Sequence, residues 1–207
     1  GPLFYIKLLA VLLMSYLLGS IPFGYVVGRL QGIDVTRYGS GKTGGTNVGR
    51  LLGWRGFLLT ALGDMGKAVA AVLLARLVLQ NEWAAVAAGL AAVIGHDWSL
   101  YLDGRGGRGV GPSFAVLLLF SPLVALAGVV VFGLIILWKR YVSLGSLTGT
   151  AAALVGVVLA VVVGGQPAAY LGFALVAAPL IFFQHRDNIQ RLLAGTERRL
   201  GEPVTKT

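Results

Sequence analysis

The chain has 207 residues, of which 57% are hydrophobic and only 12% charged, and its mean hydropathy is +0.82. A water-soluble domain carries about a quarter charged residues, so the composition excludes a soluble globular enzyme and a disordered chain and indicates an integral membrane protein. The net charge of +9 comes from bases that lie between long apolar runs, which fits the positive-inside bias of membrane proteins better than nucleic-acid binding.

The inventory of reactive residues limits the chemistry further. The chain has no cysteine and two histidines, which excludes disulfides, cysteine metal sites and an acyl-cysteine intermediate, and disfavours a His-rich metal centre. We therefore expect neither a metal nor another cofactor. Gly1 and Pro2 are typical of the remnant of a protease-cleaved tag. No linker, low-complexity tract or repeat divides the rest, so residues 3–207 are predicted to form a single domain.

Apolar runs follow one another along the chain. Five have the length expected for crossing a hydrocarbon core about 30 Å thick: Leu8–Val27, Gly56–Leu79, Trp83–Leu102, Val142–Val163 and Ala168–Phe183. A further run, Val110–Trp138, is too long for one span, because at about 1.5 Å per residue it would reach about 43 Å. It contains Ser121 followed by Pro122, a pair that breaks helices.

The distribution of basic residues decides whether that long run is one helix or two. Lysines and arginines collect in segments 29–55, 105–108, 139–140 and 186–206, whereas the connections 80–82 and 164–167 contain none. A break near Ser121 places all four basic segments on one side of the membrane, in agreement with the positive-inside rule. The sequence therefore predicts an all-α polytopic membrane protein with seven transmembrane helices, a short fourth helix, the N-terminus outside and the C-terminus cytoplasmic.

Two glycine clusters differ from the dispersed glycines, which let helices pack closely. The first is Gly39–Asn47, followed by Arg50, and the second is Gly104–Gly109, which leads into the predicted short helix. Glycine permits backbone angles that let consecutive N–H groups converge on an anion, a helix N-terminus adds partial positive charge, and arginine donors match phosphate oxygens. Either loop alone could be a flexible connector, but their occurrence together favours an anion site.

A nucleotide-binding P-loop is the alternative for the first cluster. Gly39–Thr46 lacks the spacing Gly-x-x-x-x-Gly-Lys-Ser/Thr, and no β-strand is predicted before it, so nucleotide hydrolysis is disfavoured. The candidate anion-binding residues of the two loops are Gly39, Gly41, Lys42, Thr46, Asn47, Gly104, Arg105, Gly106, Gly107 and Gly109.

Polar residues also occur at the end of the last apolar run and inside the second. His185 and Asn188 are spaced i, i+3 and face one side if the helix continues, and His185 is either an interfacial side chain or a candidate general base or donor. Asp64 and Lys67 lie where ionisable groups are costly and are expected to form a structural ion pair. His96 is expected to help position the loop that follows it.

These clusters, in this order, resemble the membrane acyl-phosphate:glycerol-3-phosphate acyltransferases of the PlsY type. The similarity covers nearly the whole chain, and the ordered set is specific although each segment alone is weak. The similar segments are Gly19–Pro22, Gly39–Gly41, Thr46–Asn47 with Arg50, Asp64 with Lys67, Gly95–His96, Gly106–Val110, Tyr141–Ser146, His185–Leu192 and Gly195–Glu197.

The resemblance implies transfer of a fatty acyl group from acyl phosphate to the 1-hydroxyl of glycerol 3-phosphate, which gives lysophosphatidic acid. It implies catalytic roles for Ser40, Arg50, Arg108, His185 and Asn188 and substrate binding by Ser146. We expect Ser143 to bind substrate as well, and Asp64, Lys67, His96 and Glu197 to be structural. Because the donor is an activated mixed anhydride, neither an enzyme nucleophile nor a metal is needed. Either His185 or a substrate phosphate can accept the hydroxyl proton.

The resemblance also implies partners and a location. The expected partners are the two small-molecule substrates and membrane lipid, with no nucleic acid and no obligate protein partner. The expected location is the cell membrane, which the chain crosses several times, with the active site facing the cytoplasm. Arg105 and Arg108 stand where the family usually has lysines, and residues 42–45 differ from its usual Asn-Pro-Gly-Ala. An acyltransferase for a different phospho-alcohol therefore stays open.

Two other classes of function remain as alternatives. A transporter or flippase of an anionic solute needs ionisable residues along both halves of a pathway, whereas here only Asp64 and Lys67 lie deep in a span. A non-catalytic membrane scaffold gives no reason for His185 and Asn188 to accompany the basic glycine loops. The sequence therefore favours the acyltransferase.

Overall fold

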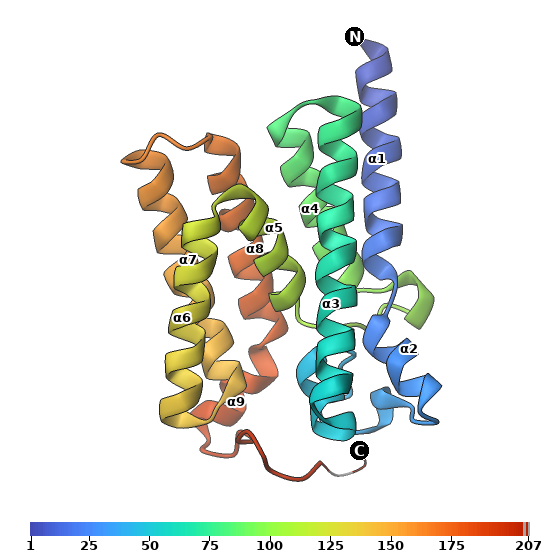
Figure 1. Ribbon diagram of the computed structural model, residues 1–207, viewed down its shortest axis with the longest axis vertical. Helices are drawn as coiled ribbons and strands as arrows, with labels where there is room; N and C mark the ends of the chain where they lie inside the picture. Colours follow the sequence, from blue (N-terminus) through green and yellow to red (C-terminus); the bar gives the residue numbers. More distant parts are fainter. Residues whose placement is uncertain (205, 207) are drawn as a thin grey trace. The chain divides into compact units, whose positions relative to one another are not determined.

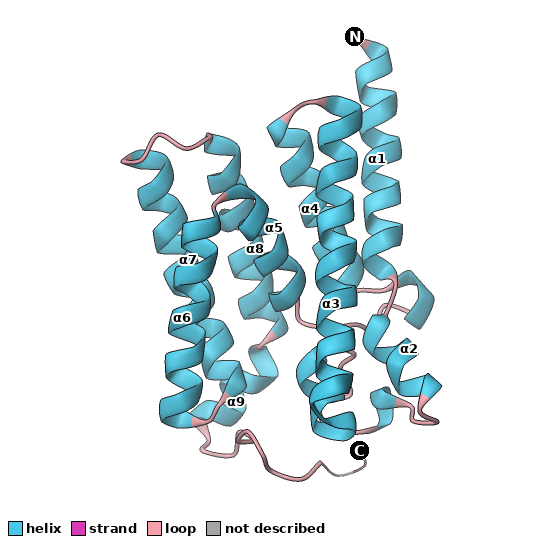
Figure 2. Cartoon of the chain, in the orientation of Figure 1, coloured by secondary structure: helices cyan, strands magenta, loops and turns pink. Residues whose placement is uncertain are grey.

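The computed structural model describes residues 1–204 and 206, and over these residues the chain is helical with one isolated β-bridge, between Tyr38 and Lys206 (Figure 1, Figure 2). The predicted all-α class is confirmed. The α-helices are α1 (Pro2–Ser20), α2 (Phe23–Leu30), α3 (Gly45–Leu79), α4 (Glu82–Asp97), α5 (Val110–Phe120), α6 (Pro122–Lys139), α7 (Val142–Val162), α8 (Ala168–Gln184) and α9 (Arg186–Leu193).

Several of these helices are long and apolar enough to cross a membrane. Five segments of the described chain meet that condition, and a sixth does so if α8 and α9 are taken as one span bent by 57°. By contacts, the chain divides into two compact units, Gly1–Ala115 with the residues from Pro203 onward, and Val116–Glu202. The single domain expected for residues 3–207 stays a prediction.

The first apolar run contains a break that the sequence analysis did not place. The run Leu8–Val27 was expected to be one span, and Pro2–Leu30 is one candidate span, but the helix is interrupted inside it, because α1 ends at Ser20 and α2 begins at Phe23. Ile21 at the break has φ −59° and ψ 113°. Pro22 disfavours the helical conformation of the residue before it and has no N–H to continue the hydrogen-bond ladder. Pro22 was therefore the residue in the sequence that indicated the helix break.

The long apolar run is two helices, as predicted. Helix α5 ends at Phe120 and α6 begins at Pro122, with Ser121 between them at φ −146°. Pro122 occupies the first turn of α6, where its missing N–H has no intrahelical partner to lose. With 11 residues, α5 reaches only about 16 Å at about 1.5 Å per residue, which is about half of a hydrocarbon core.

In the first unit, α1, α3 and α4 pack side by side (Figure 1). Small residues allow α1 and α4 to approach closely: a Cβ at Gly19 would lie 2.1 Å from the carbonyl oxygen of Ala92, and one at Gly95 would lie 2.3 Å from that of Tyr16. Close backbone approach through glycine is a common way for membrane helices to associate. This packing brings the C-terminal ends of α1 and α4 together beside the two glycine loops.

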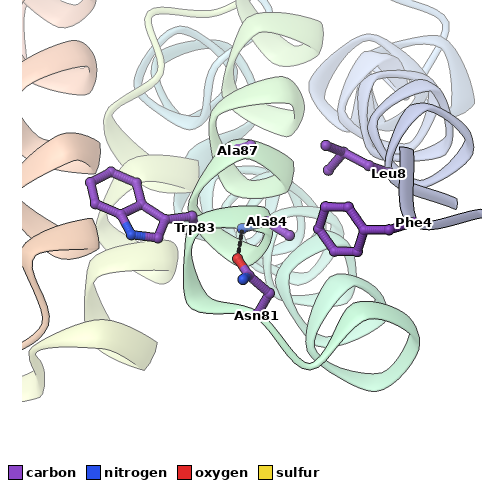
Figure 3. A pocket seen from close by; sticks show the side chains of 6 residues that line it. All are labelled: Phe4, Leu8, Asn81, Trp83, Ala84 and Ala87. Carbon is purple, nitrogen blue, oxygen red and sulfur yellow. Dashed lines mark hydrogen bonds between the residues drawn. The ribbon is translucent and has the colours of Figure 1, made fainter. Parts of the chain in front are cut away.

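An apolar cavity of about 270 Å³ lies at the other end of α3 and α4 (Figure 3). Its walls include Phe4 and Leu8 of α1 and Trp83 of α4, and Asn81 accepts a hydrogen bond from the N–H of Ala84 at 2.9 Å, which caps α4. None of the residues that line this cavity belongs to either glycine loop, so the cavity is separate from the loops.

In the second unit, α7 packs against both α6 and α8, and α9 contacts both α7 and α8. Helices α6 and α7 meet at glycines: a Cβ at Gly149 would lie 2.8 Å from the carbonyl oxygen of Gly128, and one at Gly145 would lie 2.9 Å from that of Phe132. This packing brings the N-terminal end of α7 close to the junction of α8 and α9, where His185 and Asn188 lie.

Candidate functional site

A buried asparagine organises the first glycine loop. Asn47 is only 3% exposed. Its Nδ2 donates to the carbonyl oxygens of Val35, Tyr38 and Lys42 at 3.2, 3.1 and 3.0 Å, and its Oδ1 accepts from the N–H of Ser40 at 3.3 Å. Both ends of the amide are thus engaged within the loop, which assigns Asn47 to shaping the backbone. Its predicted contact with a phosphate stays a prediction.

The glycines of this loop are required by conformation and by space. Gly39 and Gly41 have φ of 61° and 65°, in the left-handed region where glycine is strongly favoured. A Cβ at Gly39 would also lie 2.3 Å from Oδ1 of Asn47.

Before the loop, the hydroxyl of Thr36 donates to Asp34 at 2.6 Å, which lowers the pKa of the Asp34 carboxyl and keeps it charged.

The second glycine loop lies against the C-terminal end of α4. The N–H of Gly107 donates to the carbonyl oxygen of His96 at 3.0 Å, and so satisfies one of the carbonyl groups that a helix end leaves without an intrahelical partner. A Cβ at Gly106 would lie 2.1 Å from that same oxygen, and Gly109 has φ of 73°. The loop can follow the end of α4 only because these positions are glycine.

The two loops touch each other, and each ends at the start of a helix. The N–H of Thr43 points to the carbonyl oxygen of Gly106 at 3.4 Å. Helix α3 begins at Gly45 and α5 begins at Val110. Within the described part of the chain, no protein acceptor is paired with the N–H groups of Gly44, Gly45, Thr46, Gly106 and Gly109. Unpaired N–H groups at helix N-termini are the usual geometry of a phosphate site.

The predicted basic residues of these loops differ in exposure. Lys42, Arg50 and Arg108 are partly buried, whereas Arg105 is exposed and its Nε donates to the carbonyl oxygen of Leu102 at 3.3 Å. The exposed Arg105 is therefore less suited to a desolvated anion than the three partly buried bases. Ser40 is also partly buried, with its Oγ 3.4 Å from the N–H of Lys42.

In the second unit, a buried glutamate joins three segments. Oε1 of Glu197 accepts from Oγ of Ser143 at 2.9 Å and from Nδ2 of Asn188 at 2.7 Å, and Oε2 accepts from Nε of Arg191 at 2.7 Å. Arg191 also pairs with Asp187 at 3.3 Å. Glu197 thus fixes α7, α9 and the chain after α9 to one another. Ser146, one turn after Ser143, donates to the carbonyl oxygen of Val142 at 3.0 Å.

His185 lies where the helix bends. The i, i+3 argument required a helix that continues through His185. Instead, α8 ends at Gln184 and α9 begins at Arg186. His185 is 3% exposed, and its Nδ1 lies 2.8 Å from the carbonyl oxygen of Ile181. A carbonyl only accepts, so the proton of the neutral ring is on Nδ1 and Nε2 carries the lone pair. This tautomer suits a base.

Asn188 is buried beside Glu197, and its two amide ends differ. Nδ2 donates to Glu197, which orients the amide, whereas Oδ1 is buried without a hydrogen-bond partner in the described chain. A buried acceptor without a donor costs about 1–3 kcal/mol, and a ligand hydroxyl would satisfy it. Asn188 therefore combines a fixed orientation with an open acceptor.

We expect Glu197→Ala to destabilise the protein, because it leaves three donors without an acceptor. Loss of one partner of a buried charged pair costs about 3–5 kcal/mol, so the unfolding temperature in detergent should fall clearly. Glu197→Gln, which keeps one acceptor, should cost less. Glu202→Ala is the matched control, since Glu202 is an exposed glutamate in the same tail. Equal unfolding temperatures for Glu197→Ala and Glu202→Ala would contradict the structural role.

The structure thus groups the predicted residues into two sets. Residues 39–47 and 104–109 meet in the first unit, together with a buried contact of Lys67 with Asp64 and His96, and Ser143, Asn188 and Glu197 meet in the second. The sequence analysis missed Thr43, which joins the two loops. Its place between the glycines of the first loop was the only signal.

The fold and these residues define a class of protein, an integral membrane protein in which two glycine loops touch each other and each precedes a helix. The family model described as glycerol-3-phosphate acyltransferase matches residues 9–195. A glycerol-3-phosphate acyltransferase of Symbiobacterium thermophilum is 45% identical over 195 residues, 94% of this chain and 96% of that protein. One of Thermus thermophilus is 45% identical over 193 residues, 93% and 95% of the two chains.

Solved structures give the same result. A crystal structure of PlsY, an integral membrane glycerol 3-phosphate acyltransferase, in its glycerol 3-phosphate form has a TM-score of 0.86 and 40% identity, over 94% of this chain and 96% of that one. Its lysophosphatidic acid form has a TM-score of 0.85 and 40% identity, over 94% and 95%. The chain belongs to the glycerol-3-phosphate acyltransferase family.

Proposed function

We propose that this chain transfers a fatty acyl group from acyl phosphate to the 1-hydroxyl of glycerol 3-phosphate and so forms lysophosphatidic acid. The observation that carries the proposal is the pair of joined glycine loops, whose unpaired N–H groups precede α3 and α5 and whose partly buried bases are Lys42, Arg50 and Arg108. Both substrates of this reaction carry phosphate. Backbone donors, helix N-termini and arginine together match that ligand.

The reaction needs one proton acceptor. The hydroxyl oxygen of glycerol 3-phosphate attacks the acyl carbon, the bond between that carbon and the phosphate oxygen breaks, and inorganic phosphate leaves. We assign the hydroxyl proton to Nε2 of His185, because the contact of Nδ1 with the carbonyl oxygen of Ile181 leaves the lone pair on Nε2. Oδ1 of Asn188 is assigned to accept a hydrogen bond from a glycerol hydroxyl.

The basic residues of the first unit are assigned to neutralising the charge of the substrate phosphates. Arg108 and Arg50 offset the charge that develops on the leaving phosphate, which is the usual role of preorganised cations in acyl and phosphoryl chemistry. Ser40 of the first glycine loop is assigned as a hydroxyl donor, and Ser143 and Ser146 of α7 are assigned to substrate binding. Because acyl phosphate is already an activated anhydride, these residues need to bind, orient and move a proton, with no covalent enzyme intermediate.

The experiment that tests the function uses the purified protein in lipid nanodiscs. Acyl phosphate and a panel of phospho-alcohols are supplied, and lysophospholipid and released phosphate are measured. We expect one lysophosphatidic acid and one phosphate per turnover with glycerol 3-phosphate, and no product with glycerol. If only a different phospho-alcohol gave product, that compound and not glycerol 3-phosphate would be the acyl acceptor. Uptake of an anionic solute into vesicles without any lysophospholipid would identify a transporter instead.

The proposed topology is seven spans in the cell membrane, with the N-terminus outside and the glycine loops in the cytoplasm. The chain lacks cysteine, so single cysteines report the side directly. We expect Asp103→Cys and Lys139→Cys to react with a membrane-impermeant maleimide only from the cytoplasmic side, because a chain that reverses between α5 and α6 has all of its basic segments on that side. Gln166→Cys should react from outside. Labelling of positions 103 and 139 from opposite sides would contradict the topology.

A further inference from the structure

A buried lysine joins three parts of the first unit. Nζ of Lys67 lies 2.9 Å from Oδ1 of Asp64, 2.8 Å from the carbonyl oxygen of Ile21 and 3.0 Å from Nδ1 of His96. The contacts with Ile21 and His96 are hydrogen bonds, and the contact with Asp64 is an ion pair. Asp64, Lys67 and His96 are each about 95% buried. The network therefore ties α3 to the break after α1 and to the end of α4.

This network fixes the ring of His96. The ammonium of Lys67 only donates, so Nδ1 of His96 accepts, and the proton of the neutral ring is on Nε2. The tautomer is the reverse of that of His185. Oδ1 of Asp64 lies 3.4 Å from the same Nδ1, on the side where Lys67 approaches. The rotation of the ring is therefore set by groups that belong to α3.

The fixed ring is the surface on which the second glycine loop lies. A Cβ at Gly107 would lie 1.9 Å from Nε2 of His96, 2.6 Å from Cε1 and 2.8 Å from Cδ2. Gly107 is thus in van der Waals contact with the edge of the ring, and its N–H donates to the carbonyl oxygen of the same residue. Arg108 is the next residue. A rotation of the ring would displace Gly107 and, with it, the start of the anion-binding segment.

We propose that Asp64, Lys67 and His96 are positioning residues for substrate phosphate. Lys67, paired with Asp64, fixes the His96 ring, and the ring fixes the Gly104–Gly109 loop, which carries Arg108. The kinetic test of this inference rests on the proposed function, whereas the spectroscopic test of the His96 ring does not. It gives the intramembrane ion pair a task beyond neutralising two charges.

The kinetic test is a double-mutant cycle between His96 and Gly107. Gly107→Ala alone forces the loop away from the ring, so KM for a phosphate-bearing substrate should rise at least about tenfold. In a His96→Ala background the added methyl group has room, so Gly107→Ala should change KM by less than about threefold. Equal effects of Gly107→Ala in the two backgrounds would overturn the proposal.

A matched control and a second variant separate positioning from folding. Gly66→Ala places a methyl group beside Lys67 where no atom lies within 4 Å, so its KM should equal that of the wild type. Asp64→Asn with Lys67→Met removes both buried charges together, which folded proteins often tolerate. We expect this variant to raise KM with a smaller effect on kcat. A loss of kcat alone, at unchanged KM, would show a structural role and overturn the proposal.

A spectroscopic measurement tests, without turnover, whether Asp64 and Lys67 hold the His96 ring in one tautomer. The chain has two histidines, so ¹⁵N-histidine spectra in nanodiscs give two rings, which His185→Asn assigns. We expect the proton on Nε2 in His96 and on Nδ1 in His185, and loss of the single tautomer of His96 in Asp64→Asn with Lys67→Met. An unchanged His96 spectrum in that variant would overturn the proposal, whereas a wild type without lysophosphatidic acid synthesis would overturn only the proposed function.

Discussion

Replacement of Arg108 with alanine should cost this enzyme most of its activity. Arg108 follows Gly107 in the loop that precedes α5, is partly buried, and is the base assigned to the departing phosphate. Backbone N–H groups alone leave a doubly negative phosphate undercompensated. Hydrogen bonds to charged groups are worth about 1.5–3 kcal/mol, so we expect a loss of about tenfold to a hundredfold in kcat/KM, with KM and kcat both affected.

Two further variants make the Arg108 result specific. Arg108→Lys should keep substantial activity, because lysine meets the charge requirement although it cannot form the bidentate pair. Arg37→Ala is the control, since Arg37 is an exposed arginine whose ion pair with Asp34 spans 3.4 Å at the surface and contributes little. Steady-state kinetics on the folded variants measures all three. Wild-type kcat and KM in Arg108→Ala would show that the loop is only a connector.

His185→Ala should have the largest effect on kcat. Proton transfer by a positioned side chain contributes about 10²–10⁴-fold, and the contact of Nδ1 with Ile181 leaves Nε2 of His185 as an acceptor. Asn188→Ala should also lower turnover, by a smaller factor, because it removes the open acceptor Oδ1 and one donor to Glu197. Neither variant should prevent insertion into the membrane.

The measurement for His185 is kcat and KM over the whole accessible pH range. Gln190→Ala serves as the matched control, because Gln190 is an exposed residue of α9, and it should retain wild-type kinetics. If His185→Ala and Asn188→Ala both kept wild-type rates at every pH, the cluster at the end of α8 would be structural. The proton would then go to a phosphate oxygen of the substrate.

Much of the fold could be predicted from apolar runs and charge. The break at Ser121 followed from the length of one run and the side on which lysines and arginines collect, and α5 and α6 are separated there. The break at Ile21 was missed because the run around it has the length of a single span, so that hydropathy gave no reason to divide it. Hydropathy measures partition into the membrane, and a local backbone break barely changes it.

The parts of the site that depend on distant contacts could not be predicted. The spacing of Asp64 and Lys67 indicated an ion pair, since i, i+3 neighbours share a helix face, but His96 lies 29 residues further along the chain. Asn47 was assigned to the anion because it ends a glycine cluster, and that assignment stays a prediction, but nothing in the sequence indicated its hydrogen bonds to the carbonyl oxygens of Val35 and Lys42. A motif gives the residue types of a site, and the packing of separate helices decides which of them remain open to a ligand.

The contacts of Glu197 also bear on how the second unit is completed during synthesis. Its partner Ser143 precedes it by 54 residues and Asn188 by nine, so both hydrogen bonds form only after the last helix has left the ribosome. Until then, Ser143 and Asn188 lack the carboxylate that orients them. A chain released before residue 197 could insert all of its helices and still lack an ordered junction between α7 and α9.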